Sequence, residues 1–173
     1  MKKYQGIFIA LALLAAVSLS LAQAGKDKQA RHTTGMPAQA HTMVTPDQIK
    51  WGPGPAALPP GAQMAVLEGD PSKAGELFTI RAKMPDGYKV PPHWHPTDEN
   101  VTVLQGTLLM GLGEKFDQAA AREMTVGSFA TMPKGVRHFA MAKGETLIQV
   151  HAIGPFEVNY VNPADDPRNQ AKK

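Results

Sequence analysis

The stretch GYKVPPHWHPTDENVTVLQG, residues 87–106, decides what fold and what chemistry the sequence predicts. His93 and His95 are two residues apart, so on an extended segment both side chains leave the same face, about 7 Å apart at the backbone. Pro96 then bends the chain, and Glu99 keeps the parity of the two histidines. Two imidazoles and a carboxylate that converge in this way form a candidate metal site.

A fourth candidate ligand, His138, lies 39 residues beyond Glu99 on a predicted later strand. Four imidazole and carboxylate groups suit a divalent first-row metal such as iron, manganese, zinc or nickel, and octahedral coordination would leave two positions for water or substrate. The alternative is a set of unrelated core or surface polar groups, although unpaired charge is rarely buried. The pattern therefore predicts one open metal site.

The glycines around these residues complete two motifs that resemble those of the cupin superfamily. The motifs are Gly87-(X)5-His93-X-His95-(X)3-Glu99-(X)6-Gly106 and, after 20 intervening residues, Gly127-(X)5-Pro133-X-Gly135-(X)2-His138. Ala142 departs from the family pattern, which usually has asparagine there, and this weakens the loop match only. The resemblance implies an RmlC-like, jelly-roll barrel (a double-stranded β-helix) with His93, His95, Glu99 and His138 as ligands inside its mouth.

Composition also favours an all-β fold. The 173 residues are 43% hydrophobic, enough for one core, and 15 prolines and 16 glycines suit a turn-rich architecture better than a helical bundle. Short apolar runs separated by turn residues predict strands at 64–68, 76–84, 88–95, 100–105, 107–112, 128–132, 137–141, 146–153 and 158–161. We expect turns at 85–87 and 143–145, and one helical turn within 117–124.

The expected organisation has four parts: a signal peptide at 1–24, a flexible N-terminus with a Pro/Gly-rich arm at 25–61, the barrel at 62–163 and a solvated polar tail at 164–173. The capping pattern at 45–48 predicts a short helical turn before the arm. The proline-rich segment 52–61 is either a strap laid across the domain, with Trp51 and Leu58 as apolar contacts, or a free spacer.

The first residues carry an export pattern. Lys2 and Lys3 precede an apolar run at 7–17 and the small-residue triplet at 22–24, which is typical of a signal peptide cleaved after Ala24. A transmembrane anchor is the alternative, but the run is shorter than the roughly 20 apolar residues that a span needs. The expected product is periplasmic or secreted and free of the membrane. Without cysteine it has neither disulfides nor thiolate ligands.

Charge argues against a nucleic-acid partner. Removal of Lys2 and Lys3 leaves 16 basic against 15 acidic residues, and residues 62–163 hold 9 basic against 11 acidic ones. The predicted barrel therefore carries about −2 and offers no stripe that would bind phosphates. A small-molecule ligand or substrate is the expected partner.

Three further residues are candidates for the pocket. Gln105 continues the parity of Glu99, and Gln149 shares one face of a predicted strand with His151. If this face is turned inward, His151 is a candidate proton carrier; if it is turned outward, the pair is solvated. Trp94 lies between the two histidines and should point to the opposite face. The nine methionines are not clustered, which favours gap-filling over a copper site.

Together these features predict an exported metal-binding cupin. The resemblance implies an enzyme that acts on a small organic molecule, with chemistry of the dioxygenase, isomerase or hydrolase type. The alternatives are a non-catalytic binding or sensing protein with a structural metal, and a purely structural barrel. Because cupins commonly pair through edge strands, a homodimer is expected.

Overall fold

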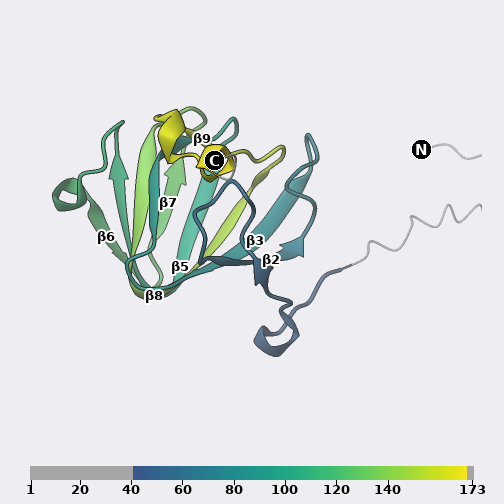
Figure 1. The fold of residues 1–173 in the computed structure, drawn as a ribbon. Helices are drawn as coiled ribbons and strands as arrows, with labels where there is room; N and C mark the ends of the chain where they lie inside the picture. Colours follow the sequence, from purple (N-terminus) through teal and green to yellow (C-terminus); the bar gives the residue numbers. More distant parts are fainter. Residues whose placement is uncertain (1–40, 171–173) are drawn as a thin grey trace, which may run out of the picture. The chain divides into compact units, whose positions relative to one another are not determined.

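Alternation of apolar and polar side chains produces antiparallel strands throughout residues 41–170, the part of the chain that the computed structural model describes. The strands are β1 (Gly52–Pro53), β2 (Gln63–Glu68), β3 (Leu77–Met84), β4 (Lys89–Trp94), β5 (Glu99–Leu112), β6 (Arg122–Thr125), β7 (Phe129–Met132), β8 (His138–Ile153) and β9 (Asn159–Tyr160). Helical turns are η1 (Pro46–Gln48), η2 (Gln118–Ala120), η3 (Pro163–Asp165) and α1 (Pro167–Gln170). The expected all-β barrel is confirmed (Figure 1).

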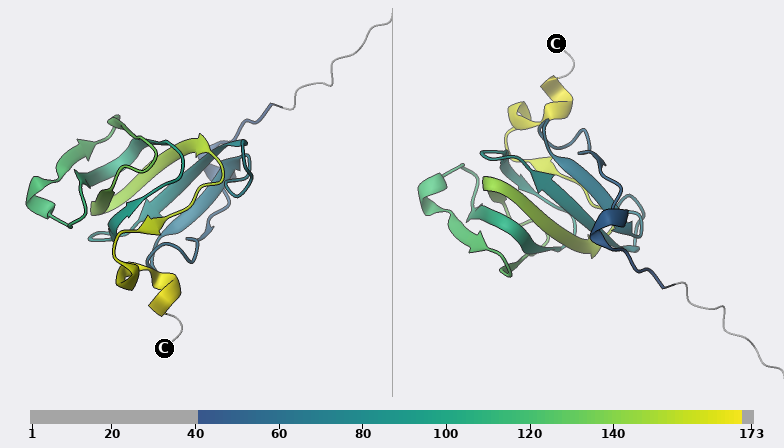
Figure 2. Two further views of the ribbon diagram at one scale, coloured as in Figure 1. Left: turned by 90° about the horizontal axis from the view of Figure 1, so that it is seen from above. Right: turned by 90° about the horizontal axis from the view of Figure 1, so that it is seen from below.

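The strands form one curled sheet whose order is β1-β2-β3-β8-β4-β9, and β5 pairs with β6, β7 and β8. Seen from above and below, the strands bend around an interior (Figure 2). β8 holds the sheet together, because it pairs with β3 and β5 along most of its length and with β4 near its start. The first part of β8 therefore lies beside His93, the histidine of β4.

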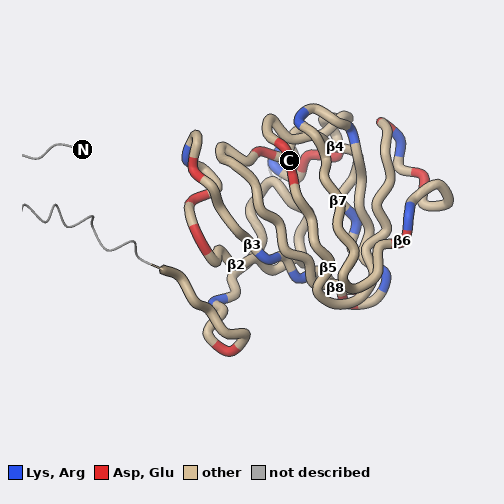
Figure 3. Tube along the Cα trace, turned by 180° about the vertical axis from the view of Figure 1, so that it is seen from behind, with Lys and Arg blue, Asp and Glu red and all other residues tan. Residues whose placement is uncertain are grey.

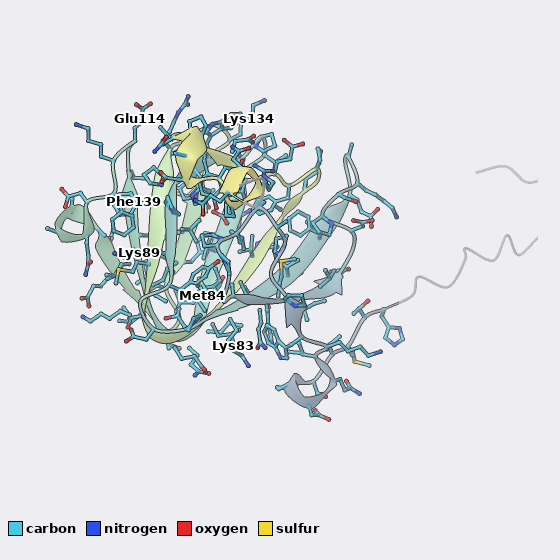
Figure 4. The ribbon with its side chains drawn as sticks, viewed as in Figure 1. Lys83, Met84, Lys89, Glu114, Lys134 and Phe139 are labelled. Carbon is cyan, nitrogen blue, oxygen red and sulfur yellow. The ribbon has the colours of Figure 1, made fainter. Side chains whose placement is uncertain are left out.

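β3 shows how the sheet separates its two faces. Its burial alternates along the strand, and the buried residues are Phe78, Ile80, Ala82 and Met84. Their register partners on β8 include Val150 and Ala152, which are buried as well. The core therefore lies on the concave side, where the side chains of β3, β5 and β8 meet (Figure 4).

The two longest strands correct the prediction. We expected breaks at Gly106 and at 143–145, but β5 and β8 each run through these positions. Gly106 has a φ of +73° and lies at a register shift between the two strands, so the chain bulges and the pairing resumes. The bulge increases the twist, which helps the sheet to curl.

A second close contact joins β5 and β8 near His138. Gly111 is the register partner of Phe139, and any side chain at Gly111 would overlap the Phe139 ring. Phe139 is 1% exposed and packs on Phe116, with ring centroids 4.7 Å apart (Figure 4). The glycine thus leaves room for an aromatic ring directly after His138 in the chain.

The segment before β6 contains the one helical turn that was predicted within 117–124. This turn is η2, where the Asp117 side chain accepts hydrogen bonds from the backbone N–H groups of Ala119 and Ala120. From Arg122 the chain is extended and pairs with β5. Pairing with a long neighbouring strand overrides the weak helix preference of three alanines.

The proline-rich segment 52–61 lies against the barrel as a strap. The Tyr160 hydroxyl donates to the Ala57 carbonyl at 2.7 Å, and the Tyr88 hydroxyl donates to the Pro59 carbonyl at 2.5 Å. Leu58 packs on the core. These contacts match the strap interpretation rather than the free spacer, and Figure 1 shows the strap on the same side of the sheet as the C-terminal segment.

Residues 162–170 are more ordered than the solvated tail that we expected. η3 and α1 follow β9, and the Asn162 side chain caps η3 by accepting from the backbone N–H of Ala164. The Arg168 side chain turns back and donates to the Val158 carbonyl at 2.9 Å. No residue of η3 or α1 is buried, as expected of a solvated segment, but a guanidinium fastens it to the loop before β9.

Lysine, arginine, aspartate and glutamate are interspersed along the trace of residues 41–170, many of them in turns and at strand ends (Figure 3). This distribution agrees with the nearly balanced charge of the sequence. Within the same residues, no helix has the length and apolarity that a membrane crossing requires. The predicted signal peptide at 1–24 and most of the flexible stretch at 25–43 lie outside the described residues.

The bulge at Gly106 can be tested against a matched glycine. Gly87 has nearly the same φ, +71° against +73°, but an added Cβ would meet nothing at Gly87, whereas at Gly106 it would overlap the Glu145 carbonyl. We expect Gly87→Ala to lower the free energy of unfolding by about 1–2 kcal/mol, from the left-handed conformation alone. Gly106→Ala should cost about 2 kcal/mol more. Urea unfolding measures both, and equal losses would contradict the close packing at the bulge.

Candidate metal centre

Three strands bring the four predicted ligands to one end of the barrel. His93 on β4 is the register partner of His138 on β8, His95 follows the end of β4, and Glu99 is the first residue of β5. All four are buried, with exposed fractions of 5% for His93, 3% for His95, 8% for Glu99 and 1% for His138. Polar side chains are rarely buried so completely without partners.

The three imidazoles face one another closely. The ring centroids of His93 and His138 are 4.2 Å apart, and those of His93 and His95 are 5.0 Å apart. One ring nitrogen from each histidine lies within 4.8 Å of the other two, close enough to share an ion. Glu99 joins this cluster, because its Oε2 lies 3.3 Å from His138 Nε2 and 3.6 Å from His95 Nε2.

Backbone carbonyls determine which nitrogen of each ring carries the proton. His93 Nδ1 is 2.8 Å from the Pro91 carbonyl, and His138 Nδ1 is 3.0 Å from the Val136 carbonyl, in both cases two residues earlier in the chain. His95 Nδ1 is 2.6 Å from the Glu157 carbonyl. A carbonyl only accepts, so each Nδ1 donates its hydrogen, and each Nε2 keeps a lone pair directed at its neighbours.

Burial also controls charge in the cluster. It lowers the pKa of His93 to about 3, with repulsion from His138 and His95 acting in the same direction. Burial likewise lowers the pKa of His95. For Glu99, burial raises the pKa, but the hydrogen bond and the positive charge that the neighbouring histidines offer when they are protonated outweigh it, so the pKa lies below its ordinary value. At neutral pH, His93 and His95 are therefore neutral and Glu99 is ionised.

These features fit a divalent cation. His95 Nε2 is buried and has no hydrogen-bond partner among residues 41–170, and His138 Nε2 directs its lone pair at a carboxylate oxygen. Two acceptors facing each other in a buried space repel unless positive charge lies between them. Neutral imidazole nitrogens and one carboxylate oxygen are the donors that iron, manganese, zinc and nickel accept.

The loop after β8 supports His95 from outside the cluster. The Phe156 ring stacks on the His95 imidazole, with centroids 4.3 Å apart and planes at 17°. The next residue, Glu157, supplies the carbonyl that holds His95 Nδ1. Arg168 fixes this loop through the Val158 carbonyl while its guanidinium pairs with Asp166 at 2.8 Å. His95 thus depends on a segment more than 60 residues away in sequence.

A cavity of about 300 Å³ opens beside the cluster inside the barrel. The three histidines and Glu99 form part of its wall, and the strap contributes Leu58. Much of the remaining wall consists of apolar side chains from β3, β5 and β8: Ile80, Ala82, Met84, Val101, Leu108, Met110, Ile148 and Val150. A small molecule in this cavity would lie directly against the four polar groups.

The structure does not bring the other three candidates into the cavity. On β8 the cavity is lined by Ile148 and Val150, so Gln149 and His151 face outward, and Gln149 accepts a hydrogen bond from Arg81 Nε at 3.1 Å. Gln105 is exposed and contacts Glu145. The prediction that these residues face the cavity is therefore wrong. On β8 the apolar residues occupy the buried face, and the polar residues that alternate with them face outward. Trp94 lies near the Arg137 guanidinium, 5.9 Å from ring centroid to Cζ, and does not line the cavity.

A comparison with protein families matches residues 73–173 to a domain of unknown function, DUF4437. The chain belongs to the DUF4437 family. No curated protein matches this DUF4437 chain significantly. The matched segment contains both motifs and all four clustered side chains.

Solved structures that resemble this DUF4437 protein show its fold. One is a putative acetylacetone dioxygenase from Methylibium petroleiphilum PM1, with 20% identity, a TM-score of 0.58 and coverage of 76% of this chain and 88% of that chain. The polyketide cyclase RemF from Streptomyces resistomycificus has 19% identity and a TM-score of 0.57, with coverage of 78% and 94%. An RmlC-like cupin from Shewanella frigidimarina NCIMB 400 has 15% identity and a TM-score of 0.52, with coverage of 67% and 94%. These similarities confirm the cupin-type barrel fold that the two motifs predict.

Sequence reasoning missed the groups that support the ligands. The carbonyls of Pro91, Val136 and Glu157 act through the backbone, which carries no sequence signal. Phe156 and Arg168 lie beyond the motifs, in a stretch whose composition indicates only loop and tail. For His93 and His138 the accepting carbonyl lies two residues earlier in the chain, whereas the carbonyl that holds His95 comes from Glu157, 62 residues later.

The buried histidines make a prediction for the metal-free DUF4437 protein. The pKa of His93 is about 3 in the folded state and ordinary in the unfolded state, so the unfolded chain binds this proton first as pH falls. The free energy of unfolding should be highest above about pH 6.5 and fall as the pH is lowered toward 3. The contribution of His93 to this loss should be about 3 kcal/mol at pH 4. Urea unfolding in the presence of a chelator, repeated between pH 7 and pH 4, measures this change in the free energy of unfolding.

Two variants separate this effect from general acid sensitivity. His93→Gln should flatten the decline between pH 6.5 and pH 4, whereas His151→Gln, on the outer face, should leave it unchanged. If the free energy of unfolding falls equally steeply with pH in wild type and His93→Gln, burial of His93 does not govern the pH dependence.

Proposed function

We propose that the protein binds one divalent metal ion through His93, His95, Glu99 and His138 and acts as an enzyme on a small organic molecule. The observation that carries the proposal is the convergence of three Nε2 lone pairs and one carboxylate at the wall of a cavity in the barrel. The convergence supports a metal, and the adjoining cavity supports a substrate that reaches it.

The bound metal would supply Lewis acidity or, if it is iron, a site that activates dioxygen. The protein's own groups do the rest. The carbonyls behind each histidine hold the rings in one tautomer, and the strap and the barrel walls exclude water. Burial raises the pKa of Tyr88 to about 12, and its hydroxyl donates to Pro59, so this cavity-lining phenol keeps its proton.

Dioxygenase chemistry is the first class to test. One similar structure is a putative acetylacetone dioxygenase and another is a polyketide cyclase, so related barrels carry names from different reaction classes. Isomerase and hydrolase chemistry remain candidates on the same metal. Oxygen uptake by the iron-loaded protein with acetylacetone and other small carbonyl or aromatic compounds would support the dioxygenase class, and turnover without oxygen uptake would favour the others.

The second candidate function is binding or sensing with a structural metal. It is favoured by the engagement of Tyr88, whose hydroxyl donates to the Pro59 carbonyl, and by the outward orientation of His151, which leave the exposed Glu157 at the cavity wall as a candidate acid or base outside the cluster. Ligand binding without turnover would support it. A metal site without ligand binding would leave a structural barrel.

Elemental mass spectrometry of protein purified without chelator or histidine tag tests the metal site. We expect about one equivalent of metal in wild type and less than a tenth of that in His138→Ala, because loss of one of four ligands leaves a buried carboxylate unpaired. His151→Ala is the matched control and should keep the metal. Wild type without metal, even after reconstitution, would overturn the proposal.

Glu99 needs its own test, because its carboxylate is assigned as the fourth ligand. Glu99→Gln keeps the shape and removes the charge, and we expect metal affinity to fall at least tenfold in a chelator competition assay. Glu145→Gln, an exposed glutamate at a different position on the barrel, should bind metal as wild type does. Equal affinities for all three proteins would limit the site to the three histidines.

Two further proposals concern location and assembly. The pattern at residues 1–24 supports export by a signal peptide cleaved after Ala24, which N-terminal sequencing of the mature protein tests. Exposed apolar side chains on neighbouring strands, Leu77 and Ile153, support a homodimer. A monodisperse monomer in small-angle scattering would overturn the dimer.

A further inference from the structure

We infer that the substrate is a compact apolar molecule of about ten non-hydrogen atoms, with one oxygen-bearing head group for the metal and an uncharged body. This inference rests on the proposed function for the head group. For the body it rests on the cavity walls and volume alone.

The walls offer a hydrocarbon surface on every strand that surrounds the cavity. Ile80 and Met84 come from β3, Val101 and Leu108 from β5, and Val150 from β8. Their side chains carry no hydrogen-bond donor, and the Met84 sulfur is only a weak acceptor. The body of any ligand in the cavity therefore lies against apolar atoms, which favours a body that is itself apolar.

The polar groups of the cavity are engaged or peripheral. The Tyr88 hydroxyl donates to the Pro59 carbonyl, so its hydrogen is used within the protein. Arg168 is paired with Asp166 and bonded to the Val158 carbonyl. Ser72 and Glu157 are exposed, so water already solvates them. This leaves the histidines and Glu99 as the polar end that a buried ligand meets.

The closed geometry makes this apolar character selective. Pro55, Ala57 and Leu58 of the strap line the cavity on one side, and two tyrosine hydroxyls hold the strap down. A polar group on the ligand body would lose its water and find no partner, which an apolar pocket penalises strongly. An apolar body makes no hydrogen bonds to water, so it loses none when it enters the cavity.

The volume limits the size of the ligand. The cavity is about 300 Å³, at the lower end of ordinary ligand sites. A water molecule occupies about 30 Å³ in the liquid, so the space holds about ten groups of that size. Ala82 is a wall residue of β3 with a single methyl group, so it leaves space that a larger side chain would fill.

A series of straight-chain alkyl hydroxamates tests head group and body together. The probes run from acetohydroxamate to decanohydroxamate on zinc-loaded wild type, with dissociation constants from calorimetry. We expect affinity to rise about three- to fourfold per methylene and to stop rising near octanohydroxamate. Suberic monohydroxamate, of similar length but ending in a carboxylate, should bind at least 30-fold more weakly than octanohydroxamate. Affinity independent of chain length, or equal affinity for the charged tail, would overturn the inference.

A pair of variants locates the effect in the cavity. Ala82→Leu narrows the space, and we expect the best chain to become two or three carbons shorter. Thr79→Leu adds an apolar side chain on the outer face of the same strand, and its chain-length profile should match wild type. Both variants should hold one zinc per chain. An unchanged optimum in Ala82→Leu would show that the tails bind elsewhere.

Failure of this inference is distinguishable from failure of the proposed function. One bound zinc with no chain-length dependence would leave the metal site standing and remove the apolar body. If no zinc binds, 1-alkanols from butanol to decanol replace the hydroxamates on the metal-free protein. The same rise and the same limit would then support the apolar body without a metal, and a flat series would overturn it.

Discussion

Everything in this barrel depends on holding four buried, electron-rich groups together. Three Nε2 lone pairs and the Glu99 carboxylate repel one another unless a cation lies among them. The protein keeps them in place by engaging the opposite side of each ring, where a backbone carbonyl accepts the Nδ1 hydrogen. The site is thus arranged before any ligand arrives.

The two long strands provide this arrangement. β5 supplies Glu99 and β8 supplies His138, and the pairing of these strands extends over most of the barrel. The bulge at Gly106 lets one strand bend without ending, and the bare backbone of Gly111 admits the Phe139 ring next to His138. The curvature of the sheet and the positions of Glu99 and His138 therefore depend on the same two strands.

The sequence was sufficient to predict the barrel, the positions of most strands and the gathering of His93, His95, Glu99 and His138, because period and fixed spacing are local properties. It could not predict the orientation of Gln149 and His151, since both faces of β8 carry suitable residues and only the packing of β3 and β5 chooses between them. Strand continuity through Gly106 and Gly144 was missed for a similar reason. Turn residues signal a bend, and tertiary pairing decides whether the strand ends there.

The Arg168 contact with the loop after β8 links the outermost helical segment to the innermost ligand. None of the strand pairing of β5 and β8 involves this segment, yet its guanidinium fastens the loop whose carbonyl and aromatic ring hold His95. A protease that removed α1 would therefore leave the strand pairing untouched but release the loop that holds His95, so a metal bound at the proposed site would be held less tightly. Metal retention would then report whether the C-terminal segment is intact, a property that the folded barrel alone does not reveal.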